Sequence, residues 1–108
     1  MRMTKFALLA SVLFPTIAWG GQINGTLFRD GQPVANENIR ITCEQNIVQN
    51  VATDPQGRFT VFVRQTGMCD FEVVRTGVKH KIYSYQLPVR YDFDVVRGLD
   101  GQDQLRRH

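Results

Sequence analysis

Few residues in this 108-residue chain are of types that could do chemistry. It has two histidines, His80 and His108, and neither lies at the His-x-x-Glu or His-x-x-x-His spacing of a zinc peptidase. The Gly-x-Ser-x-Gly pattern of a nucleophile elbow is absent, and residues 21–108 contain one serine, Ser84. We therefore expect no catalytic site, no metal site and no cofactor. A hydrolase that uses Lys79, His80 and Arg90 is the enzymatic alternative.

The two cysteines, Cys43 and Cys69, have three possible roles: a structural disulfide, metal ligation or a reactive thiol. Zinc sites need more Cys or His ligands at close spacing, and the histidines lie elsewhere in the chain. A small exported domain with an even number of cysteines favours a disulfide. The predicted Cys43–Cys69 disulfide would close the loop between the two residues. We expect this closure to add about 3–4 kcal/mol to the unfolding free energy.

Residues 1–20 have the pattern of a secretory signal peptide. Arg2 and Lys5 supply the positive charge, residues 6–17 form a mostly apolar run, and Ala18-Trp19-Gly20 ends in small residues suited to cleavage before Gly21. Cleavage after Ala18 is an alternative. A transmembrane anchor is the other interpretation, but spanning a bilayer takes about 20 apolar residues and this run is shorter. We expect an exported protein, periplasmic or extracellular, with no membrane span after cleavage.

The charge balance argues against a nucleic-acid partner. The formal charge of +3 includes Arg2 and Lys5, so residues 21–108 sit near +1. The high isoelectric point thus belongs partly to the leader and is poor support for binding to nucleic acid or anionic membranes.

Apolar and polar residues alternate with period two through most of residues 21–97, and Gly, Pro, Asn and Asp separate the segments. The pattern predicts seven short strands and no helix. They lie around residues 23–27 and at 38–44, 47–53, 58–64, 68–75, 79–87 and 89–96.

This alternation favours an antiparallel sandwich with one dry face on each sheet. Both cysteines share the inward parity of their strands, whereas Arg40 and Glu72 are among the outward residues expected to pair between neighbouring strands. In the strand at 79–87, the alternation predicts that Tyr83, Tyr85 and Leu87 face inward. Residues 98–108 are polar and contain glycine, which predicts a flexible tail.

Three segments carry a resemblance to a known family. The opening Gly25-Thr-Leu27 with Asp30-Gly31-Gln-Pro33-Val34, the segment Thr53-Asp54-Pro-Gln-Gly57-Arg-Phe59, and the strand Gly67-Met-Cys69-Asp-Phe71-Glu-Val73 resemble the carboxypeptidase regulatory-like domain. The resemblance covers residues 21–96, nearly all of the chain after the leader. Cys69 replaces an aromatic residue that is frequent in the family.

This resemblance implies a transthyretin-like (prealbumin-like) Greek-key β-sandwich of seven antiparallel strands. It also implies an accessory, adhesive or cell-surface role without catalysis. The turn residues are expected to act structurally: Asp54 accepts hydrogen bonds from amides of its own turn, Gly57 takes a positive φ, and Phe59 fills the core.

Candidate binding residues are two aromatic side chains and one basic segment. Phe28 and Phe62 have outward parity and would form a contact surface if they shared one patch; their alternative is burial at a strand end or bulge. Lys79, His80 and Lys81 form a basic segment that is either a solvated loop or a contact for an anion or an acidic glycan.

The function predicted from these features is a non-catalytic exported binding or structural module that contacts a protein or a cell-envelope component. Edge-strand pairing is one way in which such a module could bind. The alternatives are a small-ligand carrier of the transthyretin type, which requires an oligomer, and the hydrolase named above.

Overall fold

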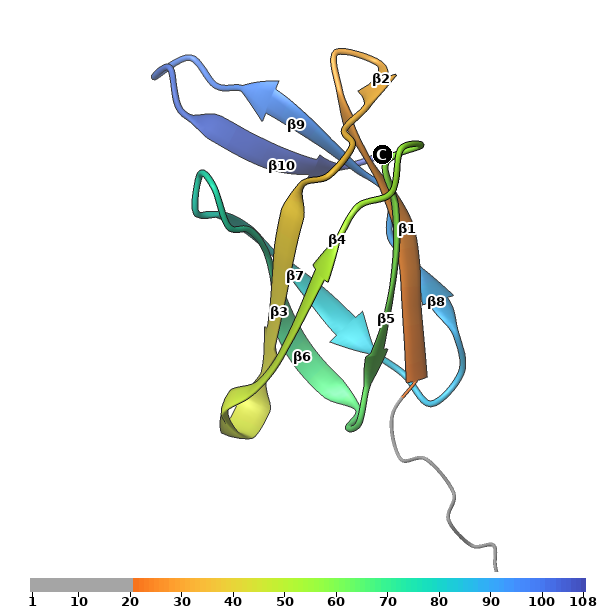
Figure 1. The fold of residues 1–108 in the computed structure, drawn as a ribbon. Helices are drawn as coiled ribbons and strands as arrows, with labels where there is room; N and C mark the ends of the chain where they lie inside the picture. The colour runs from red at the N-terminus through yellow and green to blue at the C-terminus, as the bar shows by residue number, and fades with distance from the viewer. Residues whose placement is uncertain (1–20) are drawn as a thin grey trace, which may run out of the picture.

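The structure is a computed structural model that describes residues 21–108. The predicted signal peptide at residues 1–20 lies outside the described residues. Ten strands and one short 3-10 helix form two facing sheets, an all-β arrangement consistent with a β-sandwich (Figure 1). Within residues 21–108, no helix is long and apolar enough to cross a membrane.

The first sheet is built around β1 (Gly21–Arg29). On one side β1 pairs antiparallel with β5 (Arg58–Val63) and β2 (Gln32–Pro33). On its other side β1 runs parallel to β8 (Val89–Arg90) and β9 (Phe93–Arg97). The antiparallel prediction is therefore wrong for this sheet, which is mixed.

The second sheet is antiparallel throughout, with the order β4-β3-β6-β7. Its strands are β3 (Asn38–Cys43), β4 (Ile47–Ala52), β6 (Gly67–Val73) and β7 (Val78–Ser84), and the 3-10 helix η3 (Glu44–Asn46) joins β3 to β4.

The core lies between the sheets and consists of the inward residues of alternating strands. The alternation in β1, β3, β5, β6 and β9 places these side chains inside, as predicted. The buried apolar residues include Ile23, Leu27, Ile39, Ile41, Phe59, Val61, Val63, Phe71, Val73, Phe93 and Val95.

The disulfide between Cys43 and Cys69 is confirmed. The two residues are direct partners across β3 and β6, and both are buried. On the outer face of the same strand pair, Arg40 lies opposite Glu72 with an ion pair at 3.4 Å, so the predicted charge pairing is also present. The disulfide thus fixes the register that both faces share.

A break between β8 and β9 brings the Tyr91 backbone against β1. The Tyr91 amide donates to the Asn24 carbonyl at 2.8 Å, and the Thr26 amide donates to a carboxylate oxygen of Asp92 at 2.9 Å. The Asp92 side chain thereby replaces a strand carbonyl. An added Cβ at Gly25 would overlap the Tyr91 carbonyl oxygen, so the close approach requires glycine there.

The Tyr91 side chain crosses from the first sheet to the second. Its hydroxyl accepts the Tyr83 amide proton at 2.9 Å and donates to the Tyr83 carbonyl at 3.3 Å. Because β7 is an edge strand of its sheet, these groups of Tyr83 have no neighbouring strand to bind. The hydroxyl takes the place of that strand.

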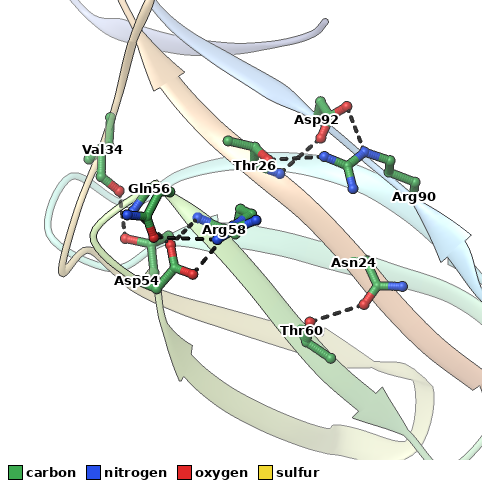
Figure 2. Close-up of polar contacts among 10 residues, drawn as sticks. Asn24, Thr26, Val34, Asp54, Gln56, Arg58, Thr60, Arg90 and Asp92 are labelled. Carbon is green, nitrogen blue, oxygen red and sulfur yellow. Dashed lines mark hydrogen bonds and ion pairs between the residues drawn. The ribbon is translucent and has the colours of Figure 1, made fainter.

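The Asp54 turn leads into β5. One carboxylate oxygen of Asp54 accepts hydrogen bonds from the amides of Gln56 and Arg58, both at 2.9 Å (Figure 2). Gly57 in this turn has φ of +77°. Thr53 stabilises the loop after β2, because its hydroxyl donates a hydrogen bond to the Val34 carbonyl at 2.6 Å.

The predicted flexible tail is wrong. Residues 103–107 form β10 (Asp103–Arg107), which pairs antiparallel with β9 and buries Leu105. With this strand and the two-residue strands β2 and β8, residues 21–108 contain ten strands and not the predicted seven. The sequence did not predict β10 because the strand has a single apolar residue among polar ones and so shows no alternation of apolar and polar residues.

We predict that the double variant Cys43→Ala/Cys69→Ala loses about 3–4 kcal/mol of unfolding free energy, because its unfolded chain regains the entropy that the disulfide removes. Urea denaturation of the oxidised wild type and the variant measures the difference. A loss below about 1 kcal/mol would show that the bond constrains the chain little, given the 2–4 kcal/mol typical of disulfides.

The Tyr91→Phe variant is expected to lose about 1–3 kcal/mol, because the Tyr83 amide and carbonyl lose their partner at a partly buried position. Tyr85→Phe is the matched control, since the Tyr85 side chain is exposed and a change in it should be near neutral. Equal stability of the two variants in urea denaturation would contradict the role of the Tyr91 hydroxyl.

Candidate functional site

The end of β7 presents aromatic side chains to solvent, opposite to the predicted parity. Tyr83 and Tyr85 are exposed, whereas Ile82 and Ser84 are buried. The register explains the correction: Ile82 is the direct partner of Cys69, whose side chain must face the core to reach Cys43. Partners across an antiparallel pair share a face, so the tyrosines point outward.

The segment after β7 continues this surface. Tyr83 and Tyr85 lie with ring centroids 4.6 Å apart, and Leu87 is 76% exposed. An open groove of about 480 Å³ follows the segment and has no charged residue in its lining, which consists of Thr66, Tyr83, Tyr85, Gln86, Leu87, Pro88 and Val89.

Two further exposed apolar side chains lie at the same end of the sandwich. Met68 on β6 lies directly opposite Tyr83. Phe62, 69% exposed, lies on β5 opposite Gln22, and the neighbouring Gly21 of β1 packs on its other side against the backbone of residues 85–87. Figure 1 shows the start of β1 and the end of β5 beside the connection from β7 to β8.

We call this set the apolar rim; it comprises Phe62, Met68, Tyr83, Tyr85 and Leu87. These are five of the seven large hydrophobic side chains that are exposed among residues 21–108; the other two are Val48 and Leu99. Scattered exposed apolar residues are ordinary, but a gathered set indicates a contact surface. The rim is the candidate functional site.

The structure separates Phe28 and Phe62, the two aromatic residues that would have formed a contact surface if they shared one patch. Phe62 belongs to the rim and lies on β5, beside the start of β1. Phe28 is near the other end of β1, half-buried, with its ring 5.1 Å from that of His108. Gln22, the partner of Phe62, is six residues from Phe28, which corresponds to about 20 Å along a strand.

The predicted basic segment does not form one surface either. Lys79 and Lys81 point outward from β7, and Lys81 forms an ion pair with Asp70 at 3.0 Å. His80 has the opposite parity, with its ring 5.0 Å from the buried Phe93. Strand alternation thus divides the three residues between two faces.

Ionisable side chains elsewhere form local pairs that hold loops and strands. Glu37, buried at the loop before β3, accepts two hydrogen bonds from the Arg75 guanidinium at 3.1 and 3.3 Å. On the outer face of the first sheet, Arg90 pairs with Asp92 at 3.0 Å and donates to the Thr26 hydroxyl (Figure 2). Lys79, His80 and Arg90 therefore do not converge on one point.

Ser84 is the one serine in residues 21–108, and it faces the interior. It is fully buried, and its hydroxyl has no hydrogen-bond partner. A nucleophile needs both a base and access to substrate, neither of which the Ser84 environment supplies.

Two residues with shifted pKa values, Asp103 and His108, lie in β10 or directly after it. The hydrogen bond from Arg29 lowers the pKa of Asp103, and Arg97 adds to the effect. The hydrogen bond to Asp94, at 2.9 Å, raises the pKa of His108 above its ordinary value of 6.5. In the turn before β5, the Arg58 amide lowers the pKa of Asp54.

Comparison with known proteins supports the fold. The chain matches no protein-family model and no curated protein sequence. Its structure is similar to that of a DUF3823 family protein from Parabacteroides merdae, with a TM-score of 0.59 and 13% identity over 73% of this chain. The chain spans 47% of that protein, about half its length. A protein from Eubacterium rectale aligns with a TM-score of 0.49 and 13% identity, over 82% of this chain and 87% of the other.

We predict that His108 titrates above 6.5 in the folded protein and that Asp94→Asn returns its pKa toward that value. Because protonated His108 binds Asp94, its stabilisation is fully present below the unfolded pKa and is lost as the pH rises through the higher folded pKa. NMR titration of the His108 ring protons measures the shift, with His80 as the internal control. An unchanged His108 pKa in Asp94→Asn would contradict the pairing.

Proposed function

We propose that the chain is an exported, non-catalytic binding module that contacts a protein or a cell-envelope component through the apolar rim. The observation that carries this proposal is the gathering of five exposed apolar side chains on one end of the sandwich. Burying such side chains against a partner releases about 25 cal/mol for each Å² of apolar area. Because the groove lining is uncharged and mostly apolar, its contact with a partner would be neutral and mostly apolar.

The assignment of a non-catalytic role is supported by what the ionisable side chains do. The paired groups described above hold the loop before β3, the turn before β5 and the β9–β10 pair. The rim, by contrast, contains tyrosine hydroxyls and apolar groups, which suit recognition better than bond cleavage.

The finer fold assignment is also part of the proposal. The Thr53–Phe59 segment that resembles the carboxypeptidase regulatory-like domain forms a turn in which Thr53 and Asp54 make the structural hydrogen bonds. This supports membership of the transthyretin-like sandwiches. Export is supported by the leader pattern and by the disulfide, which is compatible with an oxidising compartment.

The test is site-specific photo-crosslinking in a cell that exports the protein. A benzophenone amino acid replaces Leu87 in the rim or, as the matched control, Leu99 in the β9–β10 turn, which is also exposed. We expect a discrete adduct from position 87 and none from position 99, and we expect Tyr85→Ser to weaken it.

Two outcomes would contradict the proposal. One is the absence of a discrete adduct at position 87. The other is the same adduct at both positions, because that would show contact without selection by the rim.

A further inference from the structure

The outer edge of β4 is a strand edge without the usual protection. β4 (Ile47–Ala52) lies at one side of the second sheet and has β3 as its only neighbour in that sheet. Its sequence, IVQNVA, favours a strand and contains no proline, glycine or charged residue. Proteins blunt exposed edges with charged residues, proline or very short strands, and an edge that lacks them is a template for pairing with another strand.

Every second residue of β4 directs its backbone groups to this edge. Successive residues of an antiparallel strand point their N–H and C=O groups to alternate sides. The Thr53 amide donates to the Glu37 carbonyl at 3.0 Å, so Thr53 and the odd-numbered residues of β4 bind β3. Val48, Asn50 and Ala52 therefore point their amides and carbonyls away from β3, and all three residues are exposed. An open groove of about 450 Å³ lies between Ala52 and the start of β5.

The other long edge strands are protected. β7 carries Lys79 and Lys81, and the Tyr91 hydroxyl occupies the edge beyond them. β10 has three charged residues among its five. β5 begins with Arg58, whose amide and carbonyl both bind Asp54. Within residues 21–108, β4 is thus the long edge whose outward positions are all uncharged.

A second copy of β4 complements this edge. With a two-fold axis at Asn50, antiparallel pairing places Asn50 opposite Asn50 and Val48 opposite Ala52 of the second copy. All three outward residues then form hydrogen-bonded pairs, each exchanging two N–H···O bonds, and no charged side chain is opposed. An axis at Gln49 would set Ala52 opposite Asn46, which belongs to η3, and would lose one of these pairs.

We propose that the chain forms a reversible two-fold dimer through β4, in which the second sheets of the two copies join into one antiparallel sheet. This inference goes beyond the proposed function, because the partner is a second copy and β4 lies at the opposite edge of the sheet from β7. A strand pair buries little surface, so we expect the dimer to be weak and its population to depend on concentration.

Sedimentation velocity of the oxidised protein tests the dimer, at concentrations up to about 1 mM so that even a millimolar Kd is measurable. Asn50→Pro removes an amide that points to the edge and leaves the bonds to β3 intact. Asn50→Glu places two negative charges on the axis, whereas within its own chain it faces Arg40. Leu99→Glu is the matched control, since it makes the same charge change at an exposed position in the β9–β10 turn.

We expect a dimer fraction that rises with concentration in the wild type and in Leu99→Glu. Each change at Asn50 should raise the Kd about tenfold or more, and about 1 M salt should partly restore the Asn50→Glu dimer by screening the two charges. Urea denaturation checks that both variants remain folded. A monomer at every concentration, or a dimer unchanged by either substitution at Asn50, would overturn the inference.

A crosslinking experiment tests the register. Cys43 and Cys69 are bonded to each other, so an introduced cysteine is the one free thiol. A thiol crosslinker of about 5 Å matches the separation of directly opposite Cβ atoms. Asn50→Cys should therefore be crosslinked to itself, whereas Val48→Cys should not, because two copies of residue 48 are offset by about 13 Å along the strands.

Equal crosslinking at positions 48 and 50, or none at position 50, would overturn the two-fold axis at Asn50. These measurements report on two copies of this chain, and the photo-adduct at position 87 reports on the apolar rim. Loss of the dimer with a retained adduct would overturn the β4 pairing alone, and a dimer without an adduct would overturn the rim contact alone.

Discussion

The arrangement of the two sheets at the rim depends on the hydrogen bonds that the Tyr91 hydroxyl makes. Tyr91 lies in the break between β8 and β9, where its amide binds β1 and its carbonyl lies against Gly25. From there its side chain reaches the edge of β7 and binds both backbone groups of Tyr83. A single residue thus joins the central strand of one sheet to the edge strand of the other.

This link determines what the molecule offers to a partner. With the Tyr83 backbone already paired, β7 cannot add another strand at that residue, and contact there must be made by side chains. The register with Cys69 then decides which side chains these are, because it places Tyr83 and Tyr85 outside and Ile82 inside. Many charged residues are occupied in local ion pairs, and we propose the apolar rim as the surface for recognition.

The sequence predicted the parts of the fold in which alternation is clean. Period two in β3 and β6 gave the inward cysteines, the disulfide and the outward pairing of Arg40 with Glu72. It failed at β7, where the small Ser84 is buried and two large tyrosines are exposed, which inverts the usual relation of size to burial. The partnership of Ile82 with Cys69 was the signal that could have corrected it.

Other features depend on contacts that have no local pattern. β10 has only Leu105 to bury and is held by pairing with β9 and by the ion pairs of Asp103. The Asp92 carboxylate stands in for a strand carbonyl 66 residues from its partner amide. The rim gathers residues from β5, β6, β7 and the connection from β7 to β8, so no single strand pattern reveals it as a surface.

Amide hydrogen exchange at Tyr83, measured by NMR, tests whether the Tyr91 hydroxyl closes the edge of β7. The Tyr83 amide lies on an edge strand and faces away from β6, so without the Tyr91 hydroxyl it would be open to water. We expect this amide to exchange slowly, in the range of amides paired inside the sheets. Exchange as fast as that of an unpaired edge amide would show that the Tyr91 hydroxyl does not close the edge of β7.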